Sequence, residues 1–265
     1  MYDDRRMADP LIRTDIAAHV ATIVLDRPEK RNALTDDMLE QLAVAIDRVE
    51  ANHDVRVLVL RGEGQTFCSG VDLAEKLERR GADGIVEFTK LIDVFARLDR
   101  HRHPTIAVLQ GTSLAGGWEL ALHCDIRFTS PDARFGMPLA RLGLVVPYPA
   151  AVRLLQIGGV AAATDLLLSG ELIDGTRAHA CGFATHLVDA ANLPGAAAAH
   201  AAKIASLAPL AVREMKRVLR HAAPMPDPGS YGEFDDARRR ITGSADTEEG
   251  LRAFLERRPA RFSGH

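Results

Sequence analysis

The segments Gly116-Gly117-Trp118-Glu119-Leu120 and Cys68-Ser69-Gly70-Val71-Asp72-Leu73 are the most informative parts of this chain. Each places glycine where the backbone must approach another group closely, and each leads into a stretch typical of a helix. The first N–H groups of a helix have no partner within it and carry the positive end of its dipole. Two such N–H groups meeting in space would form an oxyanion hole. Glu119 would then lie beside it, in the first turn of the second helix.

The composition is that of an ordinary soluble globular protein. Of the 265 residues, 47% are hydrophobic and 26% are charged. The formal net charge of -3 gives no field that attracts nucleic acid or an anionic membrane, so we expect neither as a partner.

The three cysteines, Cys68, Cys124 and Cys181, show no CxxC spacing and no paired histidines. This pattern favours reduced, structural thiols over a disulfide framework or a metal site. The first nine residues contain no apolar stretch typical of a secretory signal. The charge-free run Pro104–Trp118 is too short to span a membrane. We therefore expect a cytoplasmic protein.

Strand and helix patterns alternate along the first part of the chain. Val20–Leu25 and Val55–Leu60 are β-branched runs typical of buried strands. Apolar residues recur at helical spacing between them, at Met38, Leu39, Leu42, Ile46 and Val49. Two further strands are expected at Thr105–Gln110 and Ile126–Thr129, with a buried helix over Leu120–Cys124. This order predicts an α/β fold with a largely parallel sheet.

The later parts of the chain are more polar and mainly helical in pattern. Ala74–Asp99 is expected to be a helix broken near Gly81 and Gly84. From Ala196 onwards the pattern predicts two or three helical pieces, interrupted by Pro224-Met225-Pro226-Asp227-Pro228-Gly229. Such pieces bury their own apolar faces poorly. We therefore divide the chain into a core, residues 1–195, and a helical section for oligomerisation, residues 196–265.

Three motifs resemble signatures of the crotonase (enoyl-CoA hydratase/isomerase) superfamily, and the resemblance extends from Ile16 to Phe262. The motifs are Asp26–Leu34, Arg61-Gly62 with Phe67–Leu73, and Gly111–Leu120 with Cys124-Asp125-Ile126. The resemblance implies a ββα spiral with a helical C-terminal section that assembles as a homotrimer or a dimer of trimers. It also implies an acyl-CoA substrate, with no metal and no cofactor, because coenzyme A is part of the substrate.

The same resemblance implies roles for individual residues. The backbone N–H groups of Val71 and Gly116 would form the oxyanion hole, and Glu119 would be the catalytic acid/base. The residues expected to contact the substrate are Lys30, Arg31, Ala33, Ser69, Gly70, Asp72, Gly117, Trp118, Leu139, Phe254 and Arg257. Among these, the loop Lys30–Ala33 and the Ser69 carbonyl would hold the adenine. Phe254 and Arg257 would touch CoA, often across a subunit boundary.

Some of these positions also have less specific interpretations. Trp118 is expected either to line the acyl pocket or to lie in the core. Glu119 could instead be a solvent-facing helix residue, although its place between two glycines and an apolar run favours catalysis. The run Arg238-Arg239-Arg240 is expected to be a solvated helix face or a contact to CoA phosphates.

The sequence departs from the hydratase pattern at the residues that handle water. Leu139, next to Pro138, occupies the position of the second hydratase glutamate. The segment Val145-Val146-Pro147-Tyr148-Pro149-Ala150 replaces a glycine-rich turn, and proline has no N–H to donate. Three hypotheses follow: an enoyl-CoA hydratase-like enzyme of fatty-acid or related acyl-CoA catabolism, a double-bond isomerase that uses Glu119 alone, or a catalytically silent CoA-binding protein.

Overall fold

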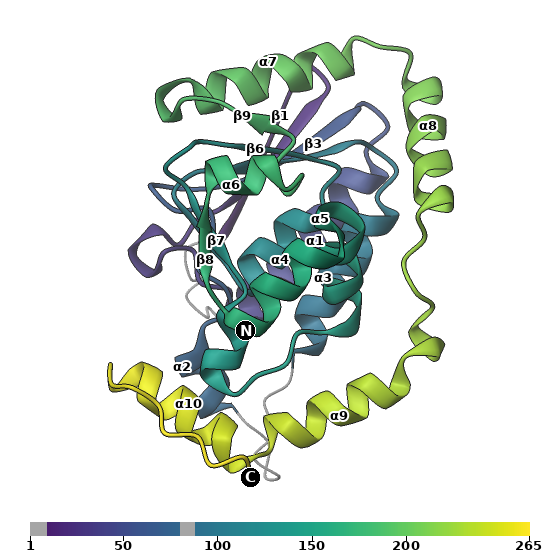
Figure 1. Ribbon diagram of the computed structural model, residues 1–265. Helices are drawn as coiled ribbons and strands as arrows, with labels where there is room; N and C mark the ends of the chain where they lie inside the picture. Colours follow the sequence, from purple (N-terminus) through teal and green to yellow (C-terminus); the bar gives the residue numbers. More distant parts are fainter. Residues whose placement is uncertain (1–9, 80–87) are drawn as a thin grey trace, which may run out of the picture.

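The computed structural model describes residues 10–79 and 88–265 (Figure 1). Its main sheet has six strands in the order β1-β2-β3-β4-β6-β9. They are β1 (Ile12–Ala17), β2 (Val20–Leu25), β3 (Val57–Gly62), β4 (Thr105–Leu109), β6 (Ile126–Thr129) and β9 (His186–Leu187). β1 pairs antiparallel with β2, and the other neighbours pair parallel. The expected α/β class with a largely parallel sheet is confirmed.

A second, three-stranded sheet gives the fold its spiral form. It has the order β5-β7-β8, from β5 (Thr112–Leu114), β7 (Arg134–Gly136) and β8 (Leu172–Asp174). Two successive turns of the chain each add a strand to the main sheet, then a strand to the second sheet, then a helix. Thus β4 and β5 precede α4 (Gly116–Leu122), and β6 and β7 precede α5 (Tyr148–Ser169).

The turn before these two has the same plan in a reduced form. After β3, the single residue Cys68 pairs with Ser113 of β5, and the chain then enters α2 (Leu73–Glu78). The structure therefore has the ββα spiral that the crotonase resemblance implied.

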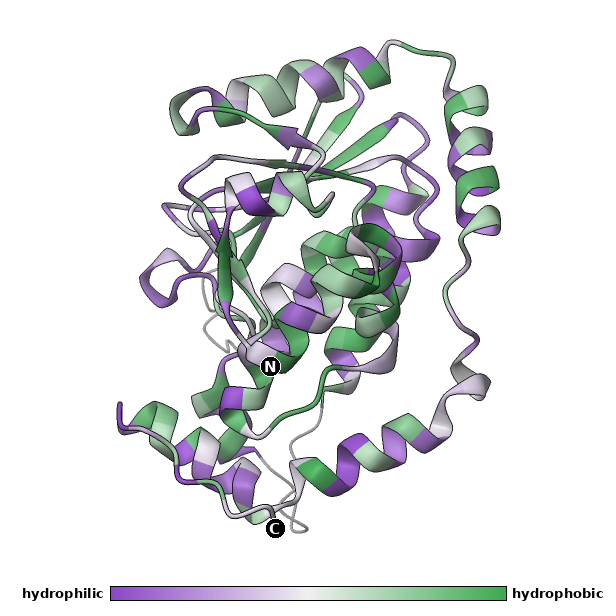
Figure 2. Cartoon of the chain, viewed as in Figure 1, coloured by the Kyte–Doolittle hydropathy of each residue, from purple (hydrophilic) through white to green (hydrophobic). Residues whose placement is uncertain are grey.

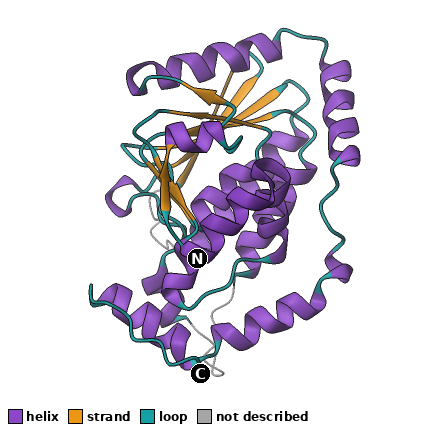
Figure 3. Cartoon of the chain, viewed as in Figure 1, coloured by secondary structure: helices purple, strands orange, loops and turns teal. Residues whose placement is uncertain are grey.

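Helices cover both faces of the main sheet (Figures 1 and 3). On one face lie α1 (Asp36–Ala51), α3 (Thr89–Arg100), α4 and α5, which enclose the larger core. The Thr35 side chain accepts a hydrogen bond from Met38 N and so caps α1. The apolar positions expected on this helix are buried. On the other face, α7 (Leu193–Ala205) packs against side chains of β3, β4 and β6.

The C-terminal section is more divided than the sequence predicted. After α7 come α8 (Pro209–Ala222), the 3₁₀ turn η4 (Pro228–Ser230), α9 (Gly232–Thr242) and α10 (Ala245–Leu255). The helices number four from α7 onwards, not two or three, and they run around the molecule from the outer sheet face to α2 (Figure 1). The boundary expected after residue 195 falls inside α7, which helps to form the core.

Several predicted boundaries also shift. β3 begins at Val57 rather than Val55, and β4 ends at Leu109 rather than Gln110. Helices α2 and α3 flank the break expected near Gly81 and Gly84, which lie outside the described residues. The remaining short elements are η1 (Pro28–Lys30), η2 (Pro138–Leu142), α6 (Gly175–Ala180) and η3 (Ala190–Asn192).

Helix α5 is the most continuously apolar of the long helices (Figure 2). Among single helices in residues 10–79 and 88–265, it alone is long and apolar enough to cross a membrane. It is bent at Gly159 and buries Leu154, Ala163 and Leu166 in the core.

Candidate active site

The two glycine-containing segments lie side by side because successive turns of the spiral are in register. Cys68 pairs with Ser113, and three residues further along each segment stand Val71 and Gly116. Leu34 pairs with Val71 from the other side. Val71 therefore lies just before α2, and Gly116 lies at the start of α4, at equivalent points of two adjacent turns.

The space between these residues is closed to further side chains. A Cβ added to Gly116 would lie 3.3 Å from Cγ2 of Val71 and 2.9 Å from Cδ2 of Leu91. Within the described residues, neither the N–H of Val71 nor that of Gly116 has a backbone hydrogen-bond acceptor. Both residues line one cavity. Two unpaired backbone donors at one cavity are what an oxyanion hole requires.

The residue before Gly116 has a strained backbone. Ala115 adopts φ 45° and ψ −127°, in the half of conformational space that glycine favours. Its own N–H donates to the carbonyl of Gly136 at 2.9 Å, which ties it to β7. Strain of this kind costs about 1–3 kcal/mol and concentrates at functional sites. No signal for it is present in the sequence, because alanine is ordinary at the start of a helix.

Glu119 enters the same cavity from the first turn of α4. It is 2% exposed, so the alternative of a solvent-facing helix residue is wrong. Burial raises the pKa of Glu119 to about 8, and the positive charge of Arg238 opposes this rise. Glu119 is therefore mostly a neutral carboxylic acid at pH 7, a form that can donate a proton.

The cavity has a volume of about 340 Å³ and a mainly apolar lining. Its apolar side chains include Leu91, Leu139, Leu142, Leu144, Val145 and Phe254. Leu139 stands on η2, so the position that carries a second glutamate in the hydratase pattern is part of the wall facing this cavity. A leucine side chain at that point cannot activate water.

Asp72 is the other carboxylate among the described lining residues, and it is already engaged. It caps α2 by accepting a hydrogen bond from Glu75 N at 3.3 Å, and it pairs with Arg27 at 2.7 Å. Although burial opposes ionisation, the Arg27 hydrogen bond leaves the pKa of Asp72 below its ordinary value. Asp72 thus holds the mouth of the cavity in shape and does not replace the missing glutamate.

A tight loop brings the predicted CoA contacts to the cavity. Lys30, Arg31, Ala33 and Ser69 all line it, and Ser69 N donates to the carbonyl of Arg31 at 3.0 Å. Asn32 holds this loop, a role that the sequence did not indicate. Its left-handed backbone has φ 53°, and its buried amide donates to the carbonyls of Thr66 and Glu63 at 2.7 and 2.9 Å.

Four of the predicted contact residues do not line the cavity. Trp118 is fully buried against Phe135 and Phe183, so it belongs to the core and we drop it from the substrate contacts. A Cβ on Gly117 would meet the carbonyl oxygen of Cys68 at 2.5 Å, which makes this glycine a packing requirement. Gly70, at φ 101°, allows the close approach of Leu114. Arg257 is exposed after α10, although Phe254 of α10 does line the cavity.

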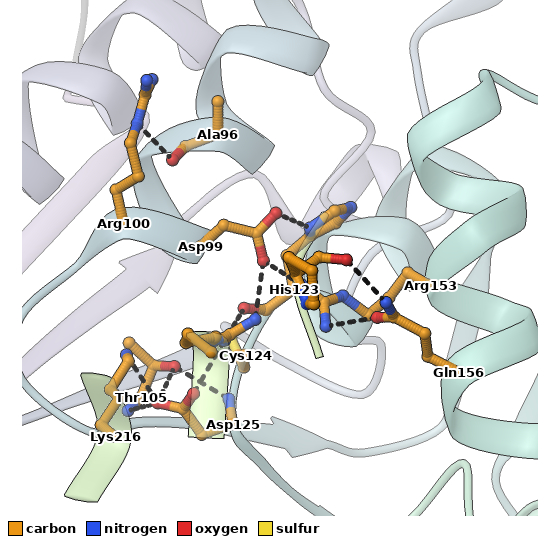
Figure 4. Close-up of polar contacts among 12 residues, drawn as sticks. Ala96, Asp99, Arg100, Thr105, His123, Cys124, Asp125, Arg153, Gln156 and Lys216 are labelled. Carbon is orange, nitrogen blue, oxygen red and sulfur yellow. Dashed lines mark hydrogen bonds and ion pairs between the residues drawn. The ribbon is translucent and has the colours of Figure 1, made fainter. Parts of the chain in front are cut away.

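A second buried polar cluster lies at the other end of α4 (Figure 4). Asp99 of α3 accepts hydrogen bonds from His123 Nδ1 at 2.8 Å, from Arg220 at 2.8 Å and from Arg153. Asp125 accepts from Lys216 and Arg220, each at 2.7 Å. Despite burial, the hydrogen bond from His123 and the charges of the arginines hold the pKa of Asp99 below its ordinary value.

Residues 15–265 match the enoyl-CoA hydratase/isomerase family. The chain is 34% identical to a putative enoyl-CoA hydratase of Thermus thermophilus over 92% of this chain and 97% of that protein. The crystal structure of an enoyl-CoA hydratase/isomerase from Xanthobacter autotrophicus Py2 matches with a TM-score of 0.80 and 32% sequence identity. The match covers 96% of this chain and 99% of that chain. The structure of a methylmalonyl-CoA decarboxylase in complex with 2-nitronate-propionyl-CoA matches with a TM-score of 0.87 and 25% sequence identity. The match covers 97% of this chain and 100% of that chain. The chain therefore belongs to the enoyl-CoA hydratase/isomerase family of the crotonase superfamily.

Within residues 10–79 and 88–265, no group of three or more His, Cys, Asp or Glu side chains could hold a metal ion.

Proposed function

We propose that the protein is an enoyl-CoA hydratase-like enzyme that processes an acyl-CoA thioester through an enolate held in the oxyanion hole. The observation that carries this proposal is the meeting of three groups at one apolar cavity. They are the unpaired N–H groups of Val71 and Gly116 and the neutral carboxyl of Glu119.

The chemistry follows from where negative charge develops. When a nucleophile adds to the β-carbon of a 2-enoyl thioester, the charge moves to the thioester oxygen. Two backbone donors at that oxygen lower the barrier, and each is worth about 3 kcal/mol in a cavity that excludes water. Glu119, protonated at neutral pH, then transfers its proton to the α-carbon, and the enolate returns to a thioester. The carboxylate that remains takes up the proton that the added water releases, which restores Glu119 to its neutral form.

The related structures support this assignment. The compound 2-nitronate-propionyl-CoA, bound by the methylmalonyl-CoA decarboxylase, carries an anionic group at the carbon next to the thioester. That group has the charge distribution of an enolate. The spiral that holds it in that protein is the fold found here.

The second candidate function is double-bond isomerisation, which the cavity wall at Leu139 favours. Hydration normally uses one carboxylate to activate water and one to deliver a proton. Isomerisation needs only one group, which takes a proton from one carbon and returns it to another. Leu139, Leu144 and Val145 present no such second group to the cavity.

Coenzyme A would enter along the loop after β2. Lys30 and Arg31 are exposed at the cavity and supply positive charge for phosphates. The Ser69 carbonyl would accept a hydrogen bond from the adenine amino group. Phe254 would touch CoA, and Arg257 would reach CoA from its own or a neighbouring subunit. The reaction needs no added cofactor, since coenzyme A is part of the substrate.

Mass spectrometry of reactions with crotonyl-CoA and a longer 2-enoyl-CoA tests the proposal. A product heavier than the substrate by one water would support hydration. This product should disappear in the Glu119→Gln variant and remain in the exposed control variant Glu233→Gln. A 3-enoyl-CoA converted to its 2-enoyl isomer without gain of water would support isomerisation. CoA binding without turnover of either substrate would refute both and indicate a silent binding protein.

Leu139→Glu sharpens the distinction between the two reactions. If hydration is limited by the missing carboxylate, this variant should hydrate 2-enoyl-CoA faster than the parent while its isomerase rate falls. An unchanged hydration rate would show that the proline-rich turn at Pro147 and Pro149 also keeps water from the site.

We also propose a homotrimer or a dimer of trimers in the cytoplasm, acting in fatty-acid β-oxidation or related acyl-CoA catabolism. Helix α8 supports the assembly, since it exposes a row of large apolar side chains: Leu210, Met215, Val218 and Leu219. Light scattering should give a multiple of three chains. The double variant Leu210→Lys, Leu219→Lys should give a lower mass, and an unchanged mass would place the interface elsewhere.

A further inference from the structure

Cys68 is a buried residue at the point where the two segments of the oxyanion hole meet. It is fully buried and belongs to the larger core. Its N–H donates to the carbonyl of Thr112 at 3.3 Å, and its carbonyl accepts from Leu114 N at 3.1 Å. Cys68 therefore joins the segment that leads to Val71 to the segment that leads to Gly116.

The thiol of Cys68 contacts the backbone of both segments. Its sulfur accepts a hydrogen bond at 3.4 Å from the N–H of Gly70, the residue before Val71. A Cβ added to Gly117, the residue after Gly116, would lie 2.6 Å from the same sulfur, so the first turn of α4 packs directly on it. One side chain thus supports a neighbour of each oxyanion donor.

The N–H of Gly70 differs from those of the residues around it. The N–H groups of Cys68, Ser69 and Asp72 donate to backbone carbonyls. The N–H of Gly70 has no backbone acceptor among the described residues, and it donates instead to the Cys68 sulfur. Gly70 also has φ 101°, a conformation that residues with side chains rarely adopt. The turn at Gly70 is therefore held from its N–H side by the thiol.

This turn sets the direction of the Val71 N–H. That N–H belongs to the same peptide group as the Gly70 carbonyl, which accepts from Leu34 N at 2.8 Å. The two ends of Gly70 are thus held by two different contacts, one from Leu34 and one from the Cys68 sulfur. Loss of either contact lets the peptide group turn and moves the Val71 N–H away from its direction into the cavity.

The thiol also connects the oxyanion hole to the loop expected to hold CoA. Its S–H donates to the carbonyl of Asn32 at 3.1 Å, and Asn32 is fully buried within this loop. Burial raises the pKa of the Cys68 thiol to about 12, so the sulfur keeps its proton at neutral pH. It can therefore donate and accept at once. Alanine at this position could make neither contact, whereas serine could make both.

We propose that Cys68 is a positioning residue for the oxyanion hole. Its thiol orients the N–H groups of Val71 and Gly116 so that both point at one oxygen of the substrate. Cys68 does not line the cavity, so it acts through these two donors. An enolate carries more negative charge on that oxygen than a thioester does, so misplaced donors weaken enolate binding more than thioester binding. The role rests on the proposed function, which supplies the enolate.

The direct test compares the affinities of two ligands by calorimetry, without turnover. The first, 2-nitronate-propionyl-CoA, has the charge of an enolate, and the second, butyryl-CoA, is an uncharged thioester. In Cys68→Ala the affinity for the nitronate should fall at least about tenfold, because displaced donors lose much of their effect. The affinity for butyryl-CoA should change little. Cys68→Ser should restore most of the preference for the nitronate, because it retains a donor and an acceptor.

Cys124→Ala is the matched control for loss of a buried thiol. Cys124 is 3% exposed, and its thiol donates to the carbonyl of Leu120 at 3.9 Å, at the other end of α4. Removing this sulfur leaves a void of similar size but touches neither oxyanion segment. The ratio of the two affinities should therefore stay that of the parent.

The outcomes separate this inference from the proposed function. An unchanged ratio of affinities in folded Cys68→Ala would overturn the inference, and so would an equal change in Cys124→Ala. In turnover assays, kcat should fall at least about tenfold in Cys68→Ala with little change in KM, and it should recover in Cys68→Ser. A lowered ratio in a protein that processes no enoyl-CoA would support the role of Cys68 and refute only the function. A parent that binds both ligands equally would lack an oxyanion hole, which would overturn both.

Hydrogen exchange in the parent tests the contact itself if Cys68→Ala does not fold. The amide of Gly70 should then be protected from exchange to a similar degree as that of Ser69, which has a backbone acceptor. Mass spectrometry with fragmentation to single residues measures both amides. Exchange of Gly70 at the rate of an exposed loop would show that the sulfur does not hold this N–H, and the inference would fall.

Discussion

At the start of α4, burial without a hydrogen-bond partner among the described residues raises the pKa of Glu119 to about 8. Near the end of the same helix, Asp99 of the neighbouring helix α3 is mostly buried and keeps a pKa below its ordinary value. Asp99 receives hydrogen bonds from His123, Arg153 and Arg220. Glu119 faces an apolar cavity. The two carboxyl groups, which lie near opposite ends of α4, thus have opposite protonation states at neutral pH.

The difference shows that the fold places the carboxyl group suited to proton transfer and the carboxylate suited to holding helices together at different ends of α4. A carboxylate that is fully paired is fixed in place and cannot exchange a proton near neutral pH. A carboxyl that is desolvated and unpaired weakens the fold but can donate and accept a proton. The cluster at Asp99 and Asp125 ties α3, α5 and α8 to the end of α4, so the strained start of the same helix can be held in position.

The largest expected effect is on turnover in Glu119→Gln. The amide cannot exchange a proton, so the rate of acyl-CoA conversion should fall by roughly 10²–10⁴-fold, while CoA binding changes little. The assay is steady-state turnover of the preferred enoyl-CoA, with binding measured by calorimetry. Undiminished turnover in this variant would show that Glu119 is not the catalytic acid/base.

Asp99→Asn tests the supporting end. It leaves the buried Arg153 beside an uncharged group, which should lower the free energy of unfolding by about 3–5 kcal/mol. Denaturant titration at neutral pH measures this loss. The loss should shrink as pH falls through the range where Asp99 of the parent is protonated, because a lowered pKa stabilises the fold only above it. Asp93→Asn, on the exposed side of α3 beside Arg97, should cost less than about 1 kcal/mol.

Glu119 should affect the pH dependence of stability in the opposite direction to Asp99. Its ordinary pKa of 4.5 rises to about 8 on folding, so the folded chain keeps a proton that the unfolded chain loses. This contribution is therefore complete below pH 4.5 and declines as pH rises towards 8. Glu119→Gln should become more stable than the parent by about 3 kcal/mol between pH 4.5 and 7. Parallel pH curves for the two proteins would show that Glu119 is not desolvated.

The smallest expected effect concerns the strain at Ala115. Glycine adopts its positive φ without cost, so Ala115→Gly should raise the free energy of unfolding by about 1 kcal/mol after the entropy of the added glycine is counted. Thermal unfolding measures this change. A matched Ala121→Gly variant within α4 should instead lose stability, because glycine is a poor helix former. If Ala115→Gly also loses stability, relief of backbone strain does not decide the stability at this position.

The sequence by itself was sufficient for the family and the spiral fold, and it named the three groups that the structure brings to one cavity. These depend on local signals, because glycines mark close backbone approach and Glu119 follows them within one helical turn. It also indicated that Leu139 stands where the hydratase pattern carries its second glutamate. The strands β5, β7 and β8 were not predicted, since segments of three residues carry too little periodicity to be recognised.

Only the tertiary structure decided which of the remaining residues share the cavity. Trp118 is adjacent to Glu119 in sequence but points into the core, because neighbouring residues on a helix face different directions. Arg238 looked like part of a solvated run, yet it is only 7% exposed on α9. Burial acts through space, so the raised pKa of Glu119 could be found only once the surrounding elements were in place.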